Sequence, residues 1–204
     1  MSAPGRFVTL EGVDGAGKST HIDFIADALR ARDLRVIVTR EPGGTELAEQ
    51  LREAILRHAM EPLAETLLLL AARADHVTRV IQPALAAGLW VVCDRFADAT
   101  AAYQGAGKGV PKELIHSLSE AVHPGLQPDR TLVFDCAYEL ARSRLQASGK
   151  ALDRFEREKR AFFERVRAAY LAAAAAEPGR VRVIDAAAGL AAIRDAITRN
   201  LAGL

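Results

Sequence analysis

The chain is predicted to fold as an α/β domain built on a doubly wound, five-stranded parallel sheet. Short apolar runs alternate with segments of helical length along the sequence. Glycine-rich or charged residues follow the first three of these runs, and a sheet of this kind binds ligands at the carboxyl ends of its strands. The 204 residues, 50% of them hydrophobic, suit a single domain (1–204) and are enough to bury a large core.

The expected elements follow from the lengths of the apolar runs and of the periodic segments between them. Strands are expected at 6–10, 35–39, 89–93, 130–134 and 181–184. Helices are expected at 18–32, 45–58, 63–87, 111–122, 137–147, 154–176 and 189–201. Alternation of strands with helices of these lengths predicts βαβ units, in which helices cover both faces of a parallel sheet.

Charge and apolar patterning limit the classes of function. The formal net charge is +1, so there is no bulk electrostatic reason to expect a nucleic-acid or membrane partner. The sequence has no run of 18 apolar residues and no signal-peptide pattern, and a cytoplasmic protein is expected. Cys93 and Cys136 lie inside apolar runs, which indicates core thiols rather than a disulfide framework.

The segment 12–19 matches the pattern GxxxxGK[ST] of a phosphate-binding loop. Because glycine makes up about 7% of residues, such a match arises by chance in roughly one chain in a hundred of this size. Here it follows an expected strand and opens an expected helix, which is the context that the loop requires. Its N–H groups and the helix N-terminus are expected to bind the phosphates of ATP. The predicted ATP-binding residues are Gly12, Val13, Asp14, Gly15, Ala16, Gly17, Lys18, Ser19 and Thr20.

Three side chains near this loop are expected to act on the phosphates and on a Mg²⁺ ion. Lys18 is expected to reach the β- and γ-phosphates and is a predicted catalytic residue. The Ser19 hydroxyl is expected to join the Mg²⁺ shell, with Asp94 as the carboxylate that supports the metal. For Asp94, a helix cap or an ion pair with Arg95 is the alternative interpretation.

A guanine-nucleotide switch and a kinase for a small substrate compete as classes. A switch reads guanine through an Asn-Lys-x-Asp segment, but the one asparagine, Asn200, is followed by leucine. A motor ATPase normally needs a longer chain. A kinase needs a second anion pocket, and Arg40 and Arg95 follow the second and third expected strands, beside the phosphate loop. The kinase interpretation is therefore preferred.

A kinase also needs a lid that excludes water, and the sequence predicts one at about 143–156. Seven basic residues lie between positions 142 and 160 and flank a weakly structured stretch at 146–150. An exposed basic helix face is the alternative, and it is preferred for 157–160. The predicted catalytic residues of the lid are Arg144, Lys150 and Arg154.

Four segments in the same order and spacing resemble the thymidylate kinase family along nearly the whole chain. They are FVTLEGVDGAGKST, TREPGGT, DRF followed by AYQG, and LDRFE. TREPGGT and AYQG are the discriminating segments. The resemblance implies a P-loop fold of the nucleoside-monophosphate-kinase type with a short lid. It also implies a homodimer that uses ATP and Mg²⁺ to phosphorylate dTMP to dTDP in dTTP synthesis. Another nucleoside-monophosphate kinase or a deoxynucleoside kinase is the alternative.

The resemblance also implies roles for residues around the acceptor. Asp14 is expected near the sugar 3′-OH, catalytic Arg95 at the acceptor phosphate and Tyr103 against the deoxyribose. The thymine is expected to contact Arg73 and Gln104, although a surface ion pair is the alternative for Arg73. The substrate-side loop is expected to contribute Arg40, Glu41 and Pro42.

Three positions depart from the family pattern, and one of them is Ala99, where serine is common among relatives. Leu69 stands where relatives often have a phenylalanine, so an aliphatic side chain is expected to contact the thymine. Leu69 and Arg73 are four residues apart in an expected helix and should share one face. Gly15 stands where some relatives place an arginine, which assigns the cation of the transition state to the lid.

Overall fold

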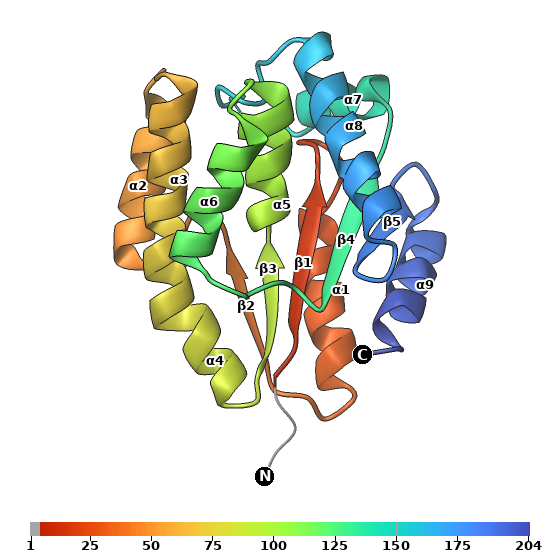
Figure 1. Ribbon diagram of the computed structural model, residues 1–204. Coiled ribbons are helices and arrows are strands. Elements are labelled where there is room, and N and C mark those ends of the chain that lie inside the picture. Colours follow the sequence, from red (N-terminus) through yellow and green to blue (C-terminus); the bar gives the residue numbers. More distant parts are fainter. Residues whose placement is uncertain (1–4, 150) are drawn as a thin grey trace.

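The computed structural model describes residues 5–149 and 151–204, which form a five-stranded parallel sheet (Figure 1). The strands are β1 (Phe7–Gly12), β2 (Val36–Arg40), β3 (Trp90–Asp94), β4 (Arg130–Asp135) and β5 (Val181–Asp185). Their order in the sheet is β2-β3-β1-β4-β5, and every neighbouring pair is parallel. The predicted sheet and all five expected strands are confirmed.

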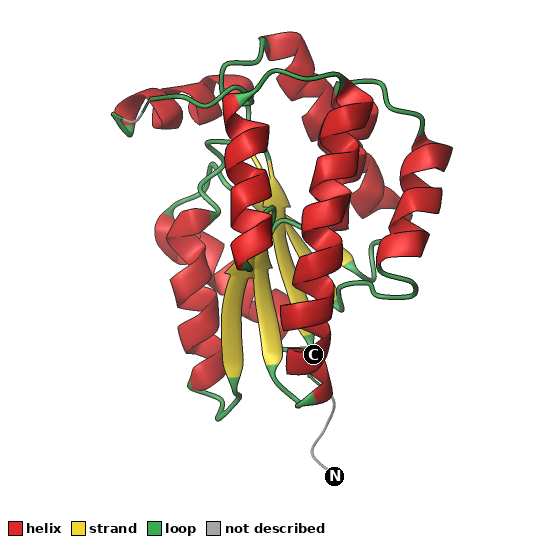
Figure 2. Cartoon of the chain, turned by 90° about the vertical axis from the view of Figure 1, so that its left-hand side faces the viewer, coloured by secondary structure: helices red, strands yellow, loops and turns green. Residues whose placement is uncertain are grey.

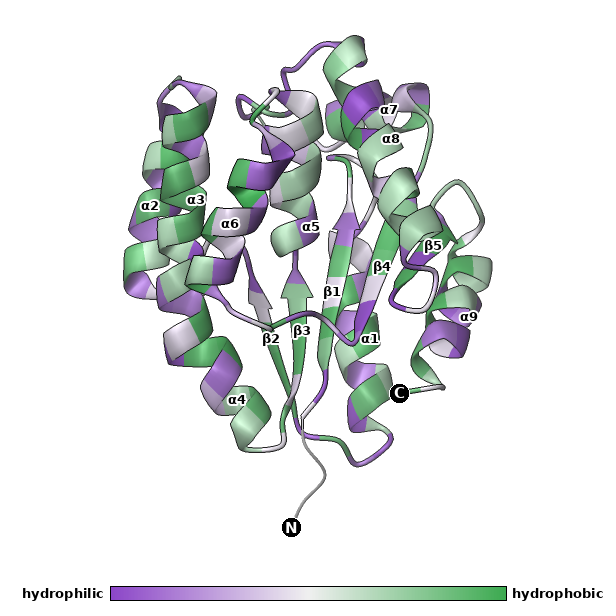
Figure 3. Cartoon of the chain, in the orientation of Figure 1, coloured by the Kyte–Doolittle hydropathy of each residue, from purple (hydrophilic) through white to green (hydrophobic). Residues whose placement is uncertain are grey.

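Burial of each strand follows its position in the sheet. All six residues of the central strand β1 are buried, including the polar Thr9 and Glu11, because helices cover both faces of the sheet at this strand. The edge strands β2 and β5 are less buried: no residue of β2 is fully buried, and in β5 only Val181 and Ile184 are. Figure 3 shows the apolar colour concentrated on the central strands.

Helices form a layer on each side of the sheet, as Figure 2 shows. On one side, α1 (Ser19–Arg30) packs against α9 (Leu190–Leu201). On the other, α8 (Arg160–Ala176) lies on β1, β4 and β5, with α5 (Ala97–Thr100) on β1. The remaining α-helices are α2 (Glu46–Arg57), α3 (Pro62–His76), α4 (Gln82–Ala86), α6 (Lys112–Val122) and α7 (Tyr138–Ala147). The apolar core fills the space between the sheet and each layer.

The segment 63–87, expected as one helix, is helical throughout but changes its winding. A π-helical turn, η1 (Val77–Ile81), joins α3 to α4. Val77 and Ile81 of this turn are buried against Phe7 of β1. The altered winding thus lies where the long helix packs on the sheet.

The observed helices differ from the expected ones in two places. A helical segment comprising α5 and the π-helical η2 (Ala101–Gly107) was not expected, because Gly105 and Gly107 disfavour a helix locally. Packing explains Gly107, since a Cβ there would lie 2.5 Å from the Phe162 ring of α8. Helix α8 begins at Arg160 rather than at 154. The Asp153 carboxylate accepts hydrogen bonds from the N–H groups of Phe155 and Glu156 and so caps a turn at 154–157, but this turn does not continue into α8.

The carboxyl ends of the strands meet at one end of the molecule, below α7 (Figure 1). The connection from α7 to α8 crosses this end, and the lid expected at 143–156 therefore begins inside α7. Among the described residues, no helix is both long and apolar enough to cross a membrane.

Candidate active site

The phosphate loop joins β1 to α1 and folds around the Lys18 side chain. Lys18 Nζ donates hydrogen bonds to the carbonyl oxygens of Gly12 and Val13, each at 3.1 Å. The φ angles of Gly12, Gly15 and Gly17 are 130°, 81° and 93°, a region that only glycine occupies without strain. Burial lowers the pKa of Lys18, and the nearby Arg95 charge lowers it further, so an arriving phosphate anion would stabilise the ammonium.

No side chain fits at position 15. A Cβ on Gly15 would lie 2.3 Å from the carbonyl oxygen of Ala141 in α7, a backbone atom that cannot turn aside. The loop therefore packs directly on α7, and it offers no cation from this position.

A cleft of about 640 Å³ runs along the phosphate loop, which is within the usual size range for a ligand site. Seven of the predicted ATP-binding residues line it: Asp14, Gly15, Ala16, Gly17, Lys18, Ser19 and Thr20. Gly12 and Val13, the first two residues of the loop, do not line the cleft, and their carbonyl oxygens accept the hydrogen bonds of Lys18. Ala186 and Ala188, which follow β5, close the far end together with His21. This cleft is the candidate donor site.

Ser19 and Asp94 both line the donor cleft, and their donor atoms suit Mg²⁺, which prefers oxygen ligands. Asp94 Oδ1 is buried and has no hydrogen-bond partner within the described part of the chain. The alternative interpretations of Asp94 are not supported: α5 has Phe96 as its N-cap, and Arg95 forms its ion pair with Asp14. No group of three or more His, Cys, Asp or Glu side chains in the described ranges could hold a metal. A bound Mg²⁺ would therefore depend on phosphate oxygens and water as well.

A second pocket of about 100 Å³ lies between α2, α3, η2 and the phosphate loop. The predicted substrate residues that line it are Asp14, Glu41, Pro42, Leu69, Arg73, Arg95, Tyr103 and Gln104. Arg40 does not, since it lines the donor cleft and pairs with Glu49 at 2.9 Å. The donor cleft and this second pocket share Asp14, Glu41, Arg52, Arg95 and Asp153. This pocket is the candidate acceptor site.

Arg95 lies where the two cavities meet and is held on several sides. Its Nη1 donates to the carbonyl oxygen of Gly12 at 2.9 Å and to the Tyr170 hydroxyl at 3.2 Å. Its Nη2 donates to Asp14 Oδ1 at 2.5 Å and to the Tyr103 hydroxyl at 3.0 Å. Burial raises the pKa of Asp14, but the charges of Arg95 and Lys18 outweigh that effect and hold it below its ordinary value. Asp14 is therefore a carboxylate that fixes Arg95.

Arg73 is buried, with 3% of its side chain exposed, so the alternative of a surface ion pair was wrong. Its Nε donates to Glu41 Oε2 at 2.6 Å, and its Nη2 donates to Phe96 O and Thr100 Oγ1, each at 3.0 Å. Its Nη1 is buried without a partner in the described part of the chain, and the residue lines the acceptor pocket. Arg73 therefore lines this pocket while one of its donor groups has no partner among the described residues.

Tyr103 and Gln104 lie on η2, at the wall of the acceptor pocket. The Tyr103 hydroxyl donates to Asp14 Oδ2 at 2.8 Å. Gln104 Nε2 donates to Glu65 Oε1 at 2.7 Å, so a buried carboxylate of α3 orients the amide. Tyr103 thus bonds to both Asp14 and Arg95, and its side chain also lines the acceptor pocket.

The two predicted lid residues that the structure describes, Arg144 and Arg154, lie in different places. Arg144 of α7 is beside the loop, where its guanidinium donates to Ala16 O at 3.2 Å and to Ala186 O at 2.9 Å. Arg154 turns away from the phosphate loop to form an ion pair with Glu65 and to donate to the carbonyl of Ile55. Lys150 lies outside the described residues. The described lid residues therefore bring one of the predicted cations, Arg144, to the donor cleft.

Sequence reasoning did not find several residues of the site. Arg52, Thr100 and Phe155 line the acceptor pocket, and Glu11 and Tyr170 support Arg95 from below. One signal was present for Glu11, because an acidic residue inside a buried strand needs a partner. Nothing in the local sequence distinguishes Tyr170 from an ordinary core residue of a helix.

Comparisons with known proteins agree with this geometry. A family model described as thymidylate kinase matches residues 10–197. A thymidylate kinase of Bordetella petrii is 55% identical over 204 residues, covering 100% of this chain and 98% of that protein. One of Methylococcus capsulatus is 53% identical, covering 98% of this chain and 97% of that protein. The crystal structure of thymidylate kinase from Ehrlichia chaffeensis has a TM-score of 0.80 and 31% identity, and covers 98% of this chain and 99% of that one.

The sheet order, the phosphate loop and an acceptor pocket that opens into the donor cleft define a P-loop kinase of the nucleoside-monophosphate-kinase type. Within that class, the family model and the relatives are decisive because they extend over nearly the whole chain. The chain belongs to the thymidylate kinase family.

Proposed function

We propose that the chain transfers the γ-phosphoryl group of ATP to the 5′-phosphate of dTMP, giving dTDP and ADP. The observation that supports this most directly is the position of Arg95, which lies where the donor cleft meets the acceptor pocket. Family membership supplies the substrate, and the alternatives of another nucleotide or nucleoside acceptor are not favoured.

The reaction needs no general base, because an oxygen of the acceptor phosphate is already anionic near neutral pH. Catalysis consists of bringing two polyanions into line and neutralising their charge. Lys18 acts on the donor phosphates, and Arg95 orients the acceptor phosphate. Asp14 keeps the Arg95 guanidinium at the junction through their 2.5 Å ion pair.

The Ser19 hydroxyl and the Asp94 carboxylate would hold Mg²⁺ in this proposal. When bound, the ion would neutralise part of the charge of the phosphates. Support comes from the unpartnered Asp94 Oδ1, since a buried carboxylate oxygen without a partner is costly. Asp94→Asn should therefore lower the affinity for Mg²⁺–ATP, measured by titration of the metal.

Base and sugar are recognised in the acceptor pocket. The free Nη1 of Arg73 would donate to a thymine carbonyl, with Gln104 beside it and Leu69 in apolar contact. Tyr103 would lie against the deoxyribose, where a 2′-OH would be crowded and would lose its water contacts. The pocket should consequently discriminate strongly against ribonucleotides. It should discriminate only modestly against dUMP, because one methyl group is worth about 1–3 kcal/mol.

The lid would supply the cation that contacts the transferred phosphoryl group. Loss of such a cation costs on the order of 10³-fold in kcat or more. Arg144 is favoured among the described residues because it already lies at the donor cleft. Neutralising Arg144, Lys150 and Arg154 one at a time tests this, and three variants with the kcat of the unmodified chain would assign the cation elsewhere.

A homodimer in the cytoplasm is part of the proposal. Exposed leucines lie on three helices that are side by side in Figure 1: Leu47 of α2, Leu63 and Leu67 of α3, and Leu114 of α6. An apolar face of this kind favours contact with a second copy. Sedimentation equilibrium should give the mass of two chains. Leu63→Asp combined with Leu67→Asp should give the mass of one, and a monomeric unmodified chain would remove the dimer.

An ATP-coupled assay with a panel of acceptors tests the function itself. The panel contains dTMP, dUMP, the ribonucleotides AMP, CMP and GMP, and the nucleoside thymidine. The highest kcat/KM is expected for dTMP. A higher value for AMP, CMP or GMP would contradict the assignment, and turnover of thymidine in place of dTMP would indicate a nucleoside kinase.

A further inference from the structure

We propose that Glu11 is a positioning residue that holds Arg95 at the junction of the two cavities, acting through the Tyr170 hydroxyl and the Phe96 backbone. Glu11 touches neither candidate ligand site, because it lies one residue before the phosphate loop with its side chain beneath it. The inference rests on the proposed function, since it concerns how the acceptor phosphate is gripped.

Both carboxyl oxygens of Glu11 accept hydrogen bonds from groups next to Arg95. Glu11 is 0% exposed. Its Oε1 accepts a hydrogen bond from the Phe96 N–H at 2.7 Å, and its Oε2 accepts one from the Tyr170 hydroxyl at 2.8 Å. The carboxyl group thus joins β1 to the segment after β3 and to α8.

The Tyr170 hydroxyl links the Glu11 carboxyl group to the Arg95 guanidinium. It accepts a hydrogen bond from Arg95 Nη1 at 3.2 Å while it donates to Glu11. Tyr170 is 2% exposed and packs edge-on to Tyr103, the other hydroxyl partner of Arg95. Arg95 is therefore held between two tyrosines, each of which is fixed by a carboxyl group: Glu11 for Tyr170 and Asp14 for Tyr103.

The backbone of Arg95 needs the same support. Its φ of 71° is uncommon for a residue other than glycine, and such a conformation persists only where its surroundings hold it. Two consecutive N–H groups are bound to consecutive residues of β1: Arg95 donates to Leu10 O at 2.9 Å, and Phe96 donates to the Glu11 side chain. The Glu11 side chain therefore helps to keep the segment in this form.

The next residue of β1, Gly12, begins the phosphate loop, and its carbonyl accepts a hydrogen bond from Arg95. One stretch of strand therefore places both the donor loop and the residue that grips the acceptor. In-line transfer is sensitive to this spacing, since a misplacement of about 1 Å can cost on the order of 100-fold in rate. This sensitivity gives the buried carboxyl group of Glu11 a role in the reaction although it touches neither ligand site.

The charged groups that face Glu11 shift its pKa in opposite directions. Burial raises its pKa, and the negative charge of Asp98 on α5 adds to this. Arg95 opposes both, as do the hydrogen bonds from Tyr170 and Phe96, and the resulting pKa is about 8. Proton loss strengthens the acceptor character of both oxygens, so the positioning should improve as pH rises through this value.

Tyr170→Phe tests the inference most directly, because it removes one hydroxyl and keeps the ring in the core. We expect the KM for dTMP to rise about tenfold, which is the usual size of a lost hydrogen bond to a charged group, while the KM for ATP is unchanged. Glu11→Gln should also raise the KM for dTMP, and should flatten the rise of kcat/KM with pH near 8. The double variant should be little worse than the more impaired single variant, because both changes break one chain of contacts.

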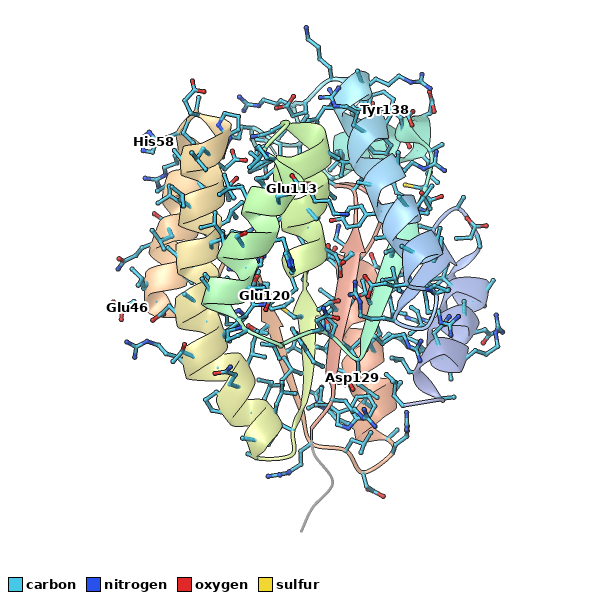
Figure 4. The ribbon with its side chains drawn as sticks, viewed as in Figure 1. Glu46, His58, Glu113, Glu120, Asp129 and Tyr138 are labelled. Atoms are coloured by element: carbon cyan, nitrogen blue, oxygen red, sulfur yellow. The ribbon has the colours of Figure 1, made fainter. Side chains whose placement is uncertain are left out.

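Tyr138→Phe is the matched control. Tyr138 lies on α7 (Figure 4) with its ring against Phe163, and it forms no hydrogen bond to Arg95, Glu11 or Tyr170 in the described part of the chain. If Tyr170→Phe leaves the KM for dTMP unchanged, as Tyr138→Phe should, or raises both KM values alike, the inference is wrong. Effects of Glu11→Gln and Tyr170→Phe that multiply in the double variant would also overturn it. An unmodified chain that does not phosphorylate dTMP would contradict the proposed function instead.

Discussion

Replacing Arg73 should separate its role in base recognition from its role in stability. Its guanidinium balances the buried Glu41 carboxylate and bonds to Phe96 and Thr100, and its Nη1 has no partner in the described part of the chain. Arg73→Lys keeps a cation near Glu41 but lacks the planar group that reaches the pocket. Arg73→Ala removes both functions. The two variants should therefore differ in stability and resemble each other in substrate recognition.

The magnitudes follow from the burial of the ion pair, whose side chains are 3% and 4% exposed. Burial raises the pKa of Glu41, but Arg73 and His76 together outweigh burial and keep the pKa below its ordinary value, so Glu41 is ionised near neutral pH. Arg73→Ala would leave that carboxylate buried without its cation, at a cost of about 3–5 kcal/mol in the free energy of unfolding. Removing both partners should cost less, because no buried charge is left uncompensated.

Urea denaturation and steady-state kinetics measure these two effects. Arg73→Lys should unfold at a urea concentration near that of the unmodified chain. Its KM for dTMP should rise by about 10- to 100-fold, as expected for lost hydrogen bonds from a charged donor, with the KM for ATP unchanged. Arg79→Ala is a control on the same helical run, since its side chain is 71% exposed and pairs only with Asp75 in the described structure. That control should change neither the KM for dTMP nor the urea midpoint appreciably.

Two outcomes would refute the reasoning. If Arg73→Lys keeps the KM for dTMP, the free Nη1 does not bind the base. If Arg73→Ala is as stable as the combined Arg73→Ala and Glu41→Ala variant, removing Arg73 does not leave Glu41 as a destabilising buried charge.

Three further predictions concern the phosphate loop and the strand that leads into it. Lys18→Ala should abolish turnover in a chain that still folds by circular dichroism, and a folded variant with unchanged kcat would contradict the phosphate-loop assignment. Gly15→Ala should lower both kcat and the thermal midpoint, because its Cβ would lie 2.3 Å from the Ala141 carbonyl. Gly125→Ala is its control, having a positive φ of 66° but no atom within 4 Å, and equal losses in the two variants would mean that the clash is unimportant. The pKa of Glu11, about 8, lies above its ordinary value of 4.5, so the folded state binds this proton more tightly than the unfolded chain. The free energy of unfolding should therefore fall as pH rises from about 4.5 to about 8, and Glu11→Gln should make this slope shallower; an identical slope would show that Glu11 titrates normally.

The sequence by itself determined the strands and the phosphate loop, because both are written in local patterns. Apolar runs such as 89–93 predict buried strands wherever they occur along a chain. The loop needs glycines at Gly12, Gly15 and Gly17 for its backbone angles, and a lysine at a set distance from them. The four segments that resemble the family likewise identified it without any knowledge of contacts.

Tertiary structure decided the features that depend on partners distant in sequence. Helix η2 forms despite Gly105 and Gly107 because packing against α8 outweighs their poor helix propensity. Arg154 belongs to the predicted lid, yet it pairs with Glu65 of α3 rather than facing the phosphate loop. Local preferences amount to about 1 kcal/mol per residue or less, so a buried contact readily overrides them.

The contacts that hold Arg95 in place show most clearly what local sequence patterns do not determine. Glu11 and Tyr170 are 159 residues apart, and no local pattern joins them. Their contact exists because β1 lies at the centre of the sheet and α8 crosses it, which brings a buried carboxyl group and a buried hydroxyl within 2.8 Å. Sequence patterns report which residues are buried and which bind phosphate. The pairing of buried polar groups depends on how the layers pack, and each such group must find its partner there because water cannot reach it.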